Sequence, residues 1–173
     1  QSVGLDQPRE GGLRLNSTPE EIERIGRMAR TSGLVVTSVS TMQLFYYPLS
    51  SFVPVVRERA IQIVRKMIES TAHLGGDLVL VVPGIVTAED PYQDVWKRSC
   101  QVLSTLVPYA EQMGVSIAIE NVWNNFLLSP IEAADYVDQF KNPIVGFYFD
   151  CGNILAYGWP EQWIKILGPR VAK

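Results

Sequence analysis

The chain has 173 residues, 47% of them hydrophobic and 19% charged, so it can bury a core, and this composition excludes the disordered class. The 15 Lys and Arg residues are scattered and the net charge is -3, which gives no basic field for a phosphate backbone and excludes nucleic acid as an expected partner. No apolar run approaches the roughly 18 residues that a membrane helix needs, and the first residues do not resemble a secretion signal, so we expect a cytoplasmic protein with no membrane partner.

Five helices are predicted along the chain, over residues 18–33, 54–74, 92–113, 129–140 and 160–167. The first is marked by a capping box, with Thr18 as N-cap, Pro19 at the first helical position and Glu21 at the third. Apolar residues at helical spacing mark the second and third helices, and Pro108 is expected to kink the third. Four of the helices end at a glycine, which is Gly33, Gly75, Gly114 or Gly168.

Short strands are predicted between the helices, over residues 34–39, 78–82, 115–119 and 145–149, and Val171 reads as the start of another. Helices and strands alternate strictly and no hairpin signal is present. This order predicts a parallel α/β sheet, either a closed (βα)₈ barrel or an open doubly wound sheet. Because the sequence begins at Gln1 and stops within a strand pattern, we expect the chain to be cut at both ends.

Two strands end in a carboxylate beside an amide. Residues 117–121 run from an apolar strand into Glu120 and Asn121, and residues 147–153 do the same at Asp150 and Asn153. The carboxyl ends of parallel strands are where α/β folds bind ligands, so two carboxylates on successive strands suggest a shared metal or acid/base site. The alternative is that each carboxylate only caps the loop after its strand.

The choice between barrel and open sheet depends on motifs. No strand is followed by G-x-G-x-x-G or by a P-loop, which removes the main support for nucleotide binding. Polar groups instead follow several strands. A site to which the loops after several strands all contribute is typical of a barrel. These groups are Thr41 and Gln43, Pro83 with Gly84, Glu120 with Asn121, and Asp150 with Asn153. A complete barrel needs about 250 residues, so we expect residues 1–173 to form a single partial TIM-barrel domain.

Three segments carry a family resemblance. Residues 119–130, 148–153 and 158–164 resemble the sugar phosphate isomerase/epimerase group of xylose isomerase-like TIM barrels, whose members include ketose 3-epimerases, L-ribulose-5-phosphate 3-epimerases and hexulose-6-phosphate isomerases. The resemblance implies a truncated barrel that runs from about the first helix to the start of the sixth strand. It also implies a divalent cation, first Mn²⁺, with Mg²⁺, Co²⁺ or Zn²⁺ as alternatives, held by Glu, Asp, His and Glu.

In this chain the resemblance assigns the first two metal ligands to Glu120 and Asp150, and the His and second Glu would lie beyond Lys173. His73 does not replace them, because a residue near the end of the second helix faces the opposite rim of a barrel. The substrate-binding His of the family reads as Asn153 here.

The implied reaction is isomerisation or epimerisation of a ketose or ketose phosphate, by proton transfer α to a carbonyl. Glu120 would act as ligand and acid/base, and Asp150 as ligand alone. Asn121, Trp123 and Asn153 are candidates to bind sugar hydroxyls, although Trp123 could equally pack its own loop. Relatives are commonly dimers or tetramers, which is compatible with a homo-oligomer, and a fragment without half the ligands is expected to be poorly active.

Two alternatives remain from the sequence. A lyase of the same superfamily, such as a dehydratase, would use a similar metal site, and a non-catalytic sugar-binding fragment would bind its ligand without metal. An endonuclease with this barrel would need a histidine-rich zinc cluster and a basic groove, and the chain has one histidine and a net charge of -3.

Overall fold

The computed structural model describes residues 2–6 and 12–173. Its centre is one five-stranded sheet in which every neighbouring pair is parallel and the spatial order follows the sequence. The strands are β1 (Ser2–Leu5), β2 (Ser38–Thr41), β3 (Leu78–Val81), β4 (Ser116–Ile119) and β5 (Val145–Phe147). Val171 forms an isolated parallel bridge with Phe147, which agrees with the predicted start of a sixth strand.

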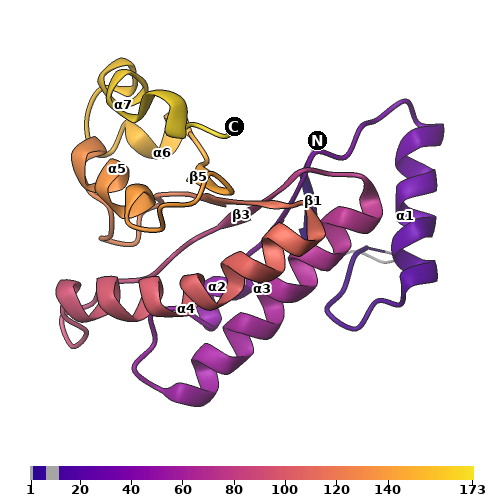
Figure 1. The fold of residues 1–173 in the computed structure, drawn as a ribbon, viewed down its shortest axis with the longest axis horizontal. Coiled ribbons are helices and arrows are strands. Elements are labelled where there is room, and N and C mark those ends of the chain that lie inside the picture. The colour runs from indigo at the N-terminus through magenta and orange to yellow at the C-terminus, as the bar shows by residue number, and fades with distance from the viewer. Residues whose placement is uncertain (1, 7–11) are drawn as a thin grey trace.

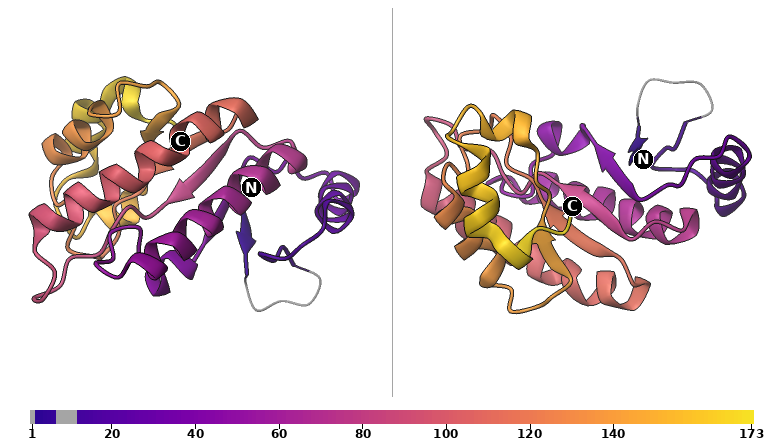
Figure 2. Two further views of the ribbon diagram at one scale, coloured as in Figure 1. Left: turned by 60° about the horizontal axis from the view of Figure 1, so that its bottom comes forward. Right: turned by 90° about the horizontal axis from the view of Figure 1, so that it is seen from above.

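The sequential strand order decides between the two predicted architectures. A doubly wound sheet reverses its strand order at a switch point, and no reversal occurs here. Because crossovers between parallel strands are right-handed, a sequential order puts all the helices on one face of the sheet, which is the barrel arrangement. Figure 1 shows α3 (Pro54–Leu74) and α4 (Tyr92–Met113) packed side by side along the strands, and Figure 2 shows the same layer from two further directions.

The five predicted helices are all present. Besides α3 and α4 they are α1 (Pro19–Thr31), α5 (Pro130–Asp138) and α7 (Pro160–Leu167). The capping box of α1 is confirmed, since Thr18 accepts from the Glu21 amide and Glu21 accepts from the Thr18 amide. Helix α4 continues through Pro108. Two four-residue helices, α2 (Gln43–Tyr46) and α6 (Cys151–Ile154), and the 3₁₀ turn Gly168–Arg170 are too short to leave a periodic pattern and were not predicted.

The first predicted strand is misplaced and one strand is missed. The apolar run was expected to pair from residue 34, but β2 begins at Ser38, and Val35 is 71% exposed. The reason is local, because Gly33 adopts φ 69° and the Leu34 amide donates to Ala29 O, so this segment completes the end of α1. The missed strand is β1, which lies ahead of the first predicted helix.

Side chains alternate between the two faces of the sheet. One set is buried in the core beneath the helices and includes Val39, Val79, Val81, Ile117, Ile119 and Phe147. The residues between them, which include Ser38 and Ser40 of β2, lie on the opposite face of the sheet. Glu120 follows Ile119 directly and therefore continues the inward-facing set of β4.

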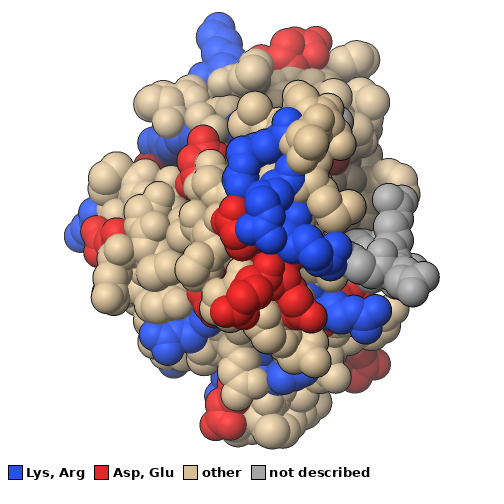
Figure 3. Space-filling view, turned by 90° about the vertical axis from the view of Figure 1, so that its right-hand side faces the viewer, with Lys and Arg blue, Asp and Glu red and all other residues tan. Residues whose placement is uncertain are grey.

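The surface around α1 carries interleaved charges. Figure 3 looks at the side on which α1 lies in Figure 1, where basic side chains stand beside acidic ones. Within α1, the Glu23 carboxylate lies 2.7 Å from Arg30 and 3.7 Å from Arg27. None of the helices in the described part of the chain combines the length and apolar character needed to cross a bilayer.

Candidate functional site

The two predicted carboxylates lie at the carboxyl ends of β4 and β5. The Glu120 amide donates to Val81 O at 3.0 Å, which extends the pairing of β4 with β3 up to the point where the carboxylate projects. Asp150 is the N-cap of α6, and its Oδ1 accepts from the amides of Gly152 at 2.8 Å and Asn153 at 3.3 Å. Asp150 therefore caps the segment after its strand, as the alternative interpretation proposed. Its second oxygen, Oδ2, takes no part in this cap and accepts from the Asn153 side chain.

One amide joins both carboxylates. Asn153 Nδ2 donates to Glu120 Oε1 at 3.3 Å and to Asp150 Oδ2 at 3.2 Å. The pKa of the Glu120 carboxyl is raised from its usual 4.5 to about 7, first by burial and then by the negative charge of Asp150, while the hydrogen bond from Asn153 acts in the opposite direction. The two acidic groups thus interact across a donor that both of them share.

A pocket of about 390 Å³ opens beside this cluster on the inner face of the sheet. Leu80 and Val82 supply apolar wall, while Glu120 and Asn153 supply polar groups. Trp123 lines the pocket with its indole largely free, at 74% exposure. The remaining lining residues are Ser40, Thr41, Met42, Phe45 and Val122. An apolar pocket with a few converging polar groups is the usual form of a small-molecule site.

Asn121 and Asp150 lie outside the residues that line this pocket. Asn121 is fully buried, and neither its Oδ1 nor its Nδ2 has a hydrogen-bond partner in the described structure. Its neighbour Val122 is held by the Tyr157 hydroxyl, which donates to the Val122 carbonyl at 2.8 Å. A buried amide without partners is costly.

Sequence reasoning identified Thr41 but missed Ser40, Met42 and Phe45, which line the same pocket. The shift of β2 toward Ser38–Thr41 explains the omission, because the predicted strand stopped at residue 39. The described residues contain no group of three or more His, Cys, Asp and Glu side chains that could hold a metal ion. His73 lies in the last turn of α3, which leads away from the carboxyl ends of the strands.

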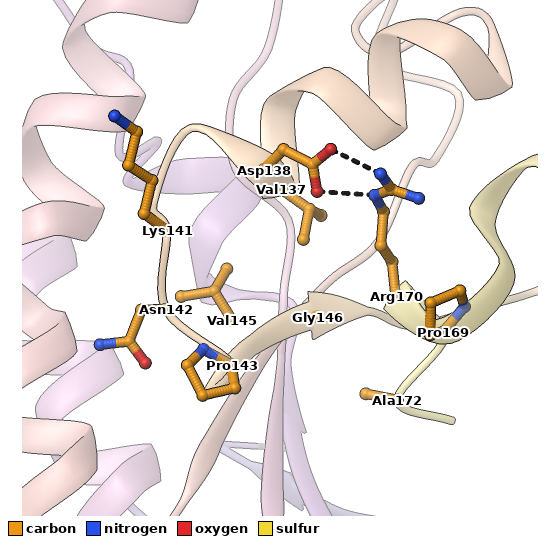
Figure 4. Close-up of a pocket in the computed structure, with 10 residues that line it drawn as sticks. All are labelled: Val137, Asp138, Lys141, Asn142, Pro143, Val145, Gly146, Pro169, Arg170 and Ala172. Carbon is orange, nitrogen blue, oxygen red and sulfur yellow. Dashed lines mark hydrogen bonds and ion pairs between the residues drawn. The ribbon is translucent and has the colours of Figure 1, made fainter.

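A hollow of about 450 Å³ lies at the other end of β5, and Figure 4 shows its lining. Two of its three charged groups pair with each other, since Arg170 donates to both carboxylate oxygens of Asp138 at 2.6 Å. This pair ties the turn Gly168–Arg170 to the end of α5 and lowers the pKa of the Asp138 carboxyl through the Arg170 hydrogen bond.

A sequentially ordered parallel sheet with helices along one face is the arrangement of the α/β barrels, which carry their sites at the carboxyl ends of the strands. The sequence over residues 3–173 matches the family described as Xylose isomerase-like TIM barrel, and the chain belongs to this family. Comparison with curated proteins gave no match.

Solved structures share the fold. An L-ribulose 3-epimerase matches with a TM-score of 0.80 and 18% identity over 98% of this chain and 56% of its own. The D-psicose 3-epimerase with D-tagatose from Clostridium cellulolyticum H10 matches with a TM-score of 0.77 and 19% identity, over 90% of this chain and 56% of its own. The IOLI protein with a binding zinc atom matches with a TM-score of 0.72 and 20% identity, over 87% of this chain and 54% of its own. The chain thus spans little more than half the length of these structures.

Proposed function

We propose that the chain is part of a divalent-metal-dependent isomerase or epimerase, which acts on a ketose or ketose phosphate by proton transfer α to the carbonyl. Residues 1–173 would form a single partial barrel domain of that enzyme. The observation that carries the proposal is the convergence of Glu120 and Asp150 on Asn153, at 3.3 and 3.2 Å, beside a pocket at the strand ends. The epimerases among the structural neighbours support the same reaction class.

The donor set fits a hard divalent cation. Carboxylate oxygens suit Mn²⁺ and Mg²⁺, and Co²⁺ and Zn²⁺ also accept them. Asn153 already donates a hydrogen bond to both carboxylates, Glu120 and Asp150, so a positive charge is favourable at the position between them. Glu120 and Asp150 would hold the cation, which when bound would polarise the substrate carbonyl and stabilise negative charge on its oxygens. A zinc-binding protein among the neighbours supports metal binding.

The chain's own groups supply proton transfer and substrate binding. In the metal-free chain, burial and the charge of Asp150 raise the pKa of the Glu120 carboxyl to about 7. With a cation bound, this pKa would be lower and Glu120 would be the carboxylate that accepts the proton. Asn153 orients Glu120 and, with Trp123 on the pocket wall, is available to bind sugar hydroxyls. The amide of Asn121, which is buried directly after Glu120 in the chain and has no hydrogen-bond partner in the described structure, would bind a hydroxyl or a water.

Manganese binding and proton exchange test the proposal together. Electron paramagnetic resonance should detect weak Mn²⁺ binding that Glu120→Gln and Asp150→Asn abolish. The control Glu161→Gln, which removes an exposed carboxylate of α7, should not change it. Incubation with D-fructose in D₂O should introduce deuterium at carbon 3, slowly and only with the metal. Metal-independent sugar binding that survives Glu120→Gln would refute catalysis and favour a binding fragment, and a dehydrated product would favour a lyase.

A further inference from the structure

A second hollow lies on the same rim, next to the candidate site. It encloses about 350 Å³ between α2, the segment that follows it and the loop after β3. Its lining residues are Phe45, Tyr46, Pro48, Ser50, Ser51, Phe52, Ile85, Thr87 and Asp90. Phe45 also lines the pocket that contains Glu120, so one aromatic side chain forms a wall of both.

The floor of this hollow is built from fixed backbone. Arg98 Nε donates to Ser50 O at 2.5 Å, and the Ile85 amide donates to Ser50 Oγ at 3.2 Å, which joins the two loops. Gly84 permits their close approach, because a Cβ there would lie 2.8 Å from Val95 and 3.1 Å from Ser50. A wall that is already ordered loses little entropy when a ligand binds.

The chemistry of the lining combines aromatic faces with hydrogen-bonding groups. Tyr46 and Phe52 are 75% and 68% exposed, although large aromatic side chains usually bury most of their surface. Asp90 is a buried carboxylate that Arg98 contacts through one oxygen, Oδ1. A carboxylate has about four acceptor positions, so positions remain for ligand hydroxyls.

The charges that line the two hollows favour a neutral ligand over a phosphate. No Lys or Arg belongs to the described lining of either hollow, whereas Asp90 and Glu120 each contribute a carboxylate. Arg98 is already paired with Asp90. A phosphate bound within the lining would therefore meet negative charge, although Arg57, which forms no ion pair in the described part of the chain, donates to the Ser51 carbonyl at the edge of the hollow at 2.6 Å. A neutral ring with one apolar face and a hydroxyl edge fits both the aromatic and the acceptor groups.

We propose that this hollow is a subsite for a second, uncharged sugar ring, so that the preferred substrate is a glycosylated ketose rather than a free ketose or a ketose phosphate. The inference rests on the proposed function, because it takes the ketose unit to occupy the Glu120 pocket. Phe45 lies between the two rings, and Tyr46, Phe52 and Asp90 contact the outer one.

Saturation-transfer NMR titrations of the chain with MgCl₂ test this. The probes are D-fructose, its glucosylated form isomaltulose, and D-fructose 6-phosphate. We expect isomaltulose to bind about tenfold more tightly than D-fructose, and D-fructose 6-phosphate to bind no better than D-fructose. Phe52→Ala and Asp90→Asn should each remove most of the advantage of isomaltulose without changing the affinity for D-fructose.

Met28→Ala is the matched control, because it truncates an exposed apolar residue of α1 that lines neither hollow. Phe52 is exposed, so Phe52→Ala keeps the test valid even if Asp90→Asn unfolds the chain, which circular dichroism would reveal. Three results would overturn the subsite. They are equal affinities for D-fructose and isomaltulose, tighter binding of D-fructose 6-phosphate than of D-fructose, and an effect of Phe52→Ala on self-association alone. Failure of every sugar to bind would overturn the proposed function as well.

Discussion

Replacing Glu120 by Gln should stabilise the metal-free protein in alkaline solution. The pKa of Glu120 rises from 4.5 in the unfolded chain to about 7 in the folded one. The folded state therefore holds the proton more tightly, so this group's contribution to stability is complete below about pH 4.5 and is lost as the pH rises through about 7. At about 1.4 kcal/mol per pH unit, the loss is about 3 kcal/mol.

Gln keeps an oxygen that can accept from Asn153 but does not ionise. Urea unfolding, followed by tryptophan fluorescence, to which the buried Trp163 contributes, would give the free energy of unfolding at about pH 5 and about pH 8.5. We expect Glu120→Gln to match the wild type at the lower pH and to exceed it by about 3 kcal/mol at the higher one. Mn²⁺ should reverse the order by stabilising only the wild type. Parallel pH profiles for wild type and variant would refute the argument, and Glu161→Gln should follow the wild type.

Three further substitutions test the framework of the fold, two of them beside the site. Gly84→Ala should destabilise the chain by about 1 to 3 kcal/mol in urea unfolding, because its Cβ would lie 2.8 Å from Val95; an unchanged midpoint would contradict this packing. Arg98→Met should cost about 3 kcal/mol by leaving Asp90 without its partner, and a cost near zero would mean that the pair is solvated. Thr18→Ala should cost about 1 kcal/mol through loss of the α1 cap, measured as a lower melting temperature, whereas Thr18→Ser should retain most of the stability.

Local signals fixed most of the elements. The capping box at Thr18 and the glycines after the helices predicted the helix limits to within a few residues, because caps and left-handed turns depend on neighbouring residues only. The strict alternation of strands and helices predicted a parallel sheet. The prediction of a strand from residue 34 was wrong because it used local signals alone. An apolar run indicates that its side chains tend to be buried, but it does not indicate whether its backbone pairs with a strand or completes a helix.

The site was half visible in the sequence. Glu120 and Asp150 could be identified because a carboxylate directly after a buried strand is a local pattern, and strand ends of a parallel sheet meet at one edge. Their shared contact with Asn153 could not be derived, because it depends on the conformation of α6 and on the register of β5 against β4. Nothing in the local sequence indicated that Phe45 would separate two hollows.

The sequence by itself thus determined the alternation of the longer helices with the strands between them and the types of side chain at the strand ends, since both follow from periodicity and residue type. Only the tertiary structure decided the sequential strand order, the pKa of Glu120 and the second hollow beside its pocket. The physical reason is distance. Glu120 and Asn153 are 33 residues apart in the chain, and the pairing of β4 with β5 and the conformation of α6 bring them into contact.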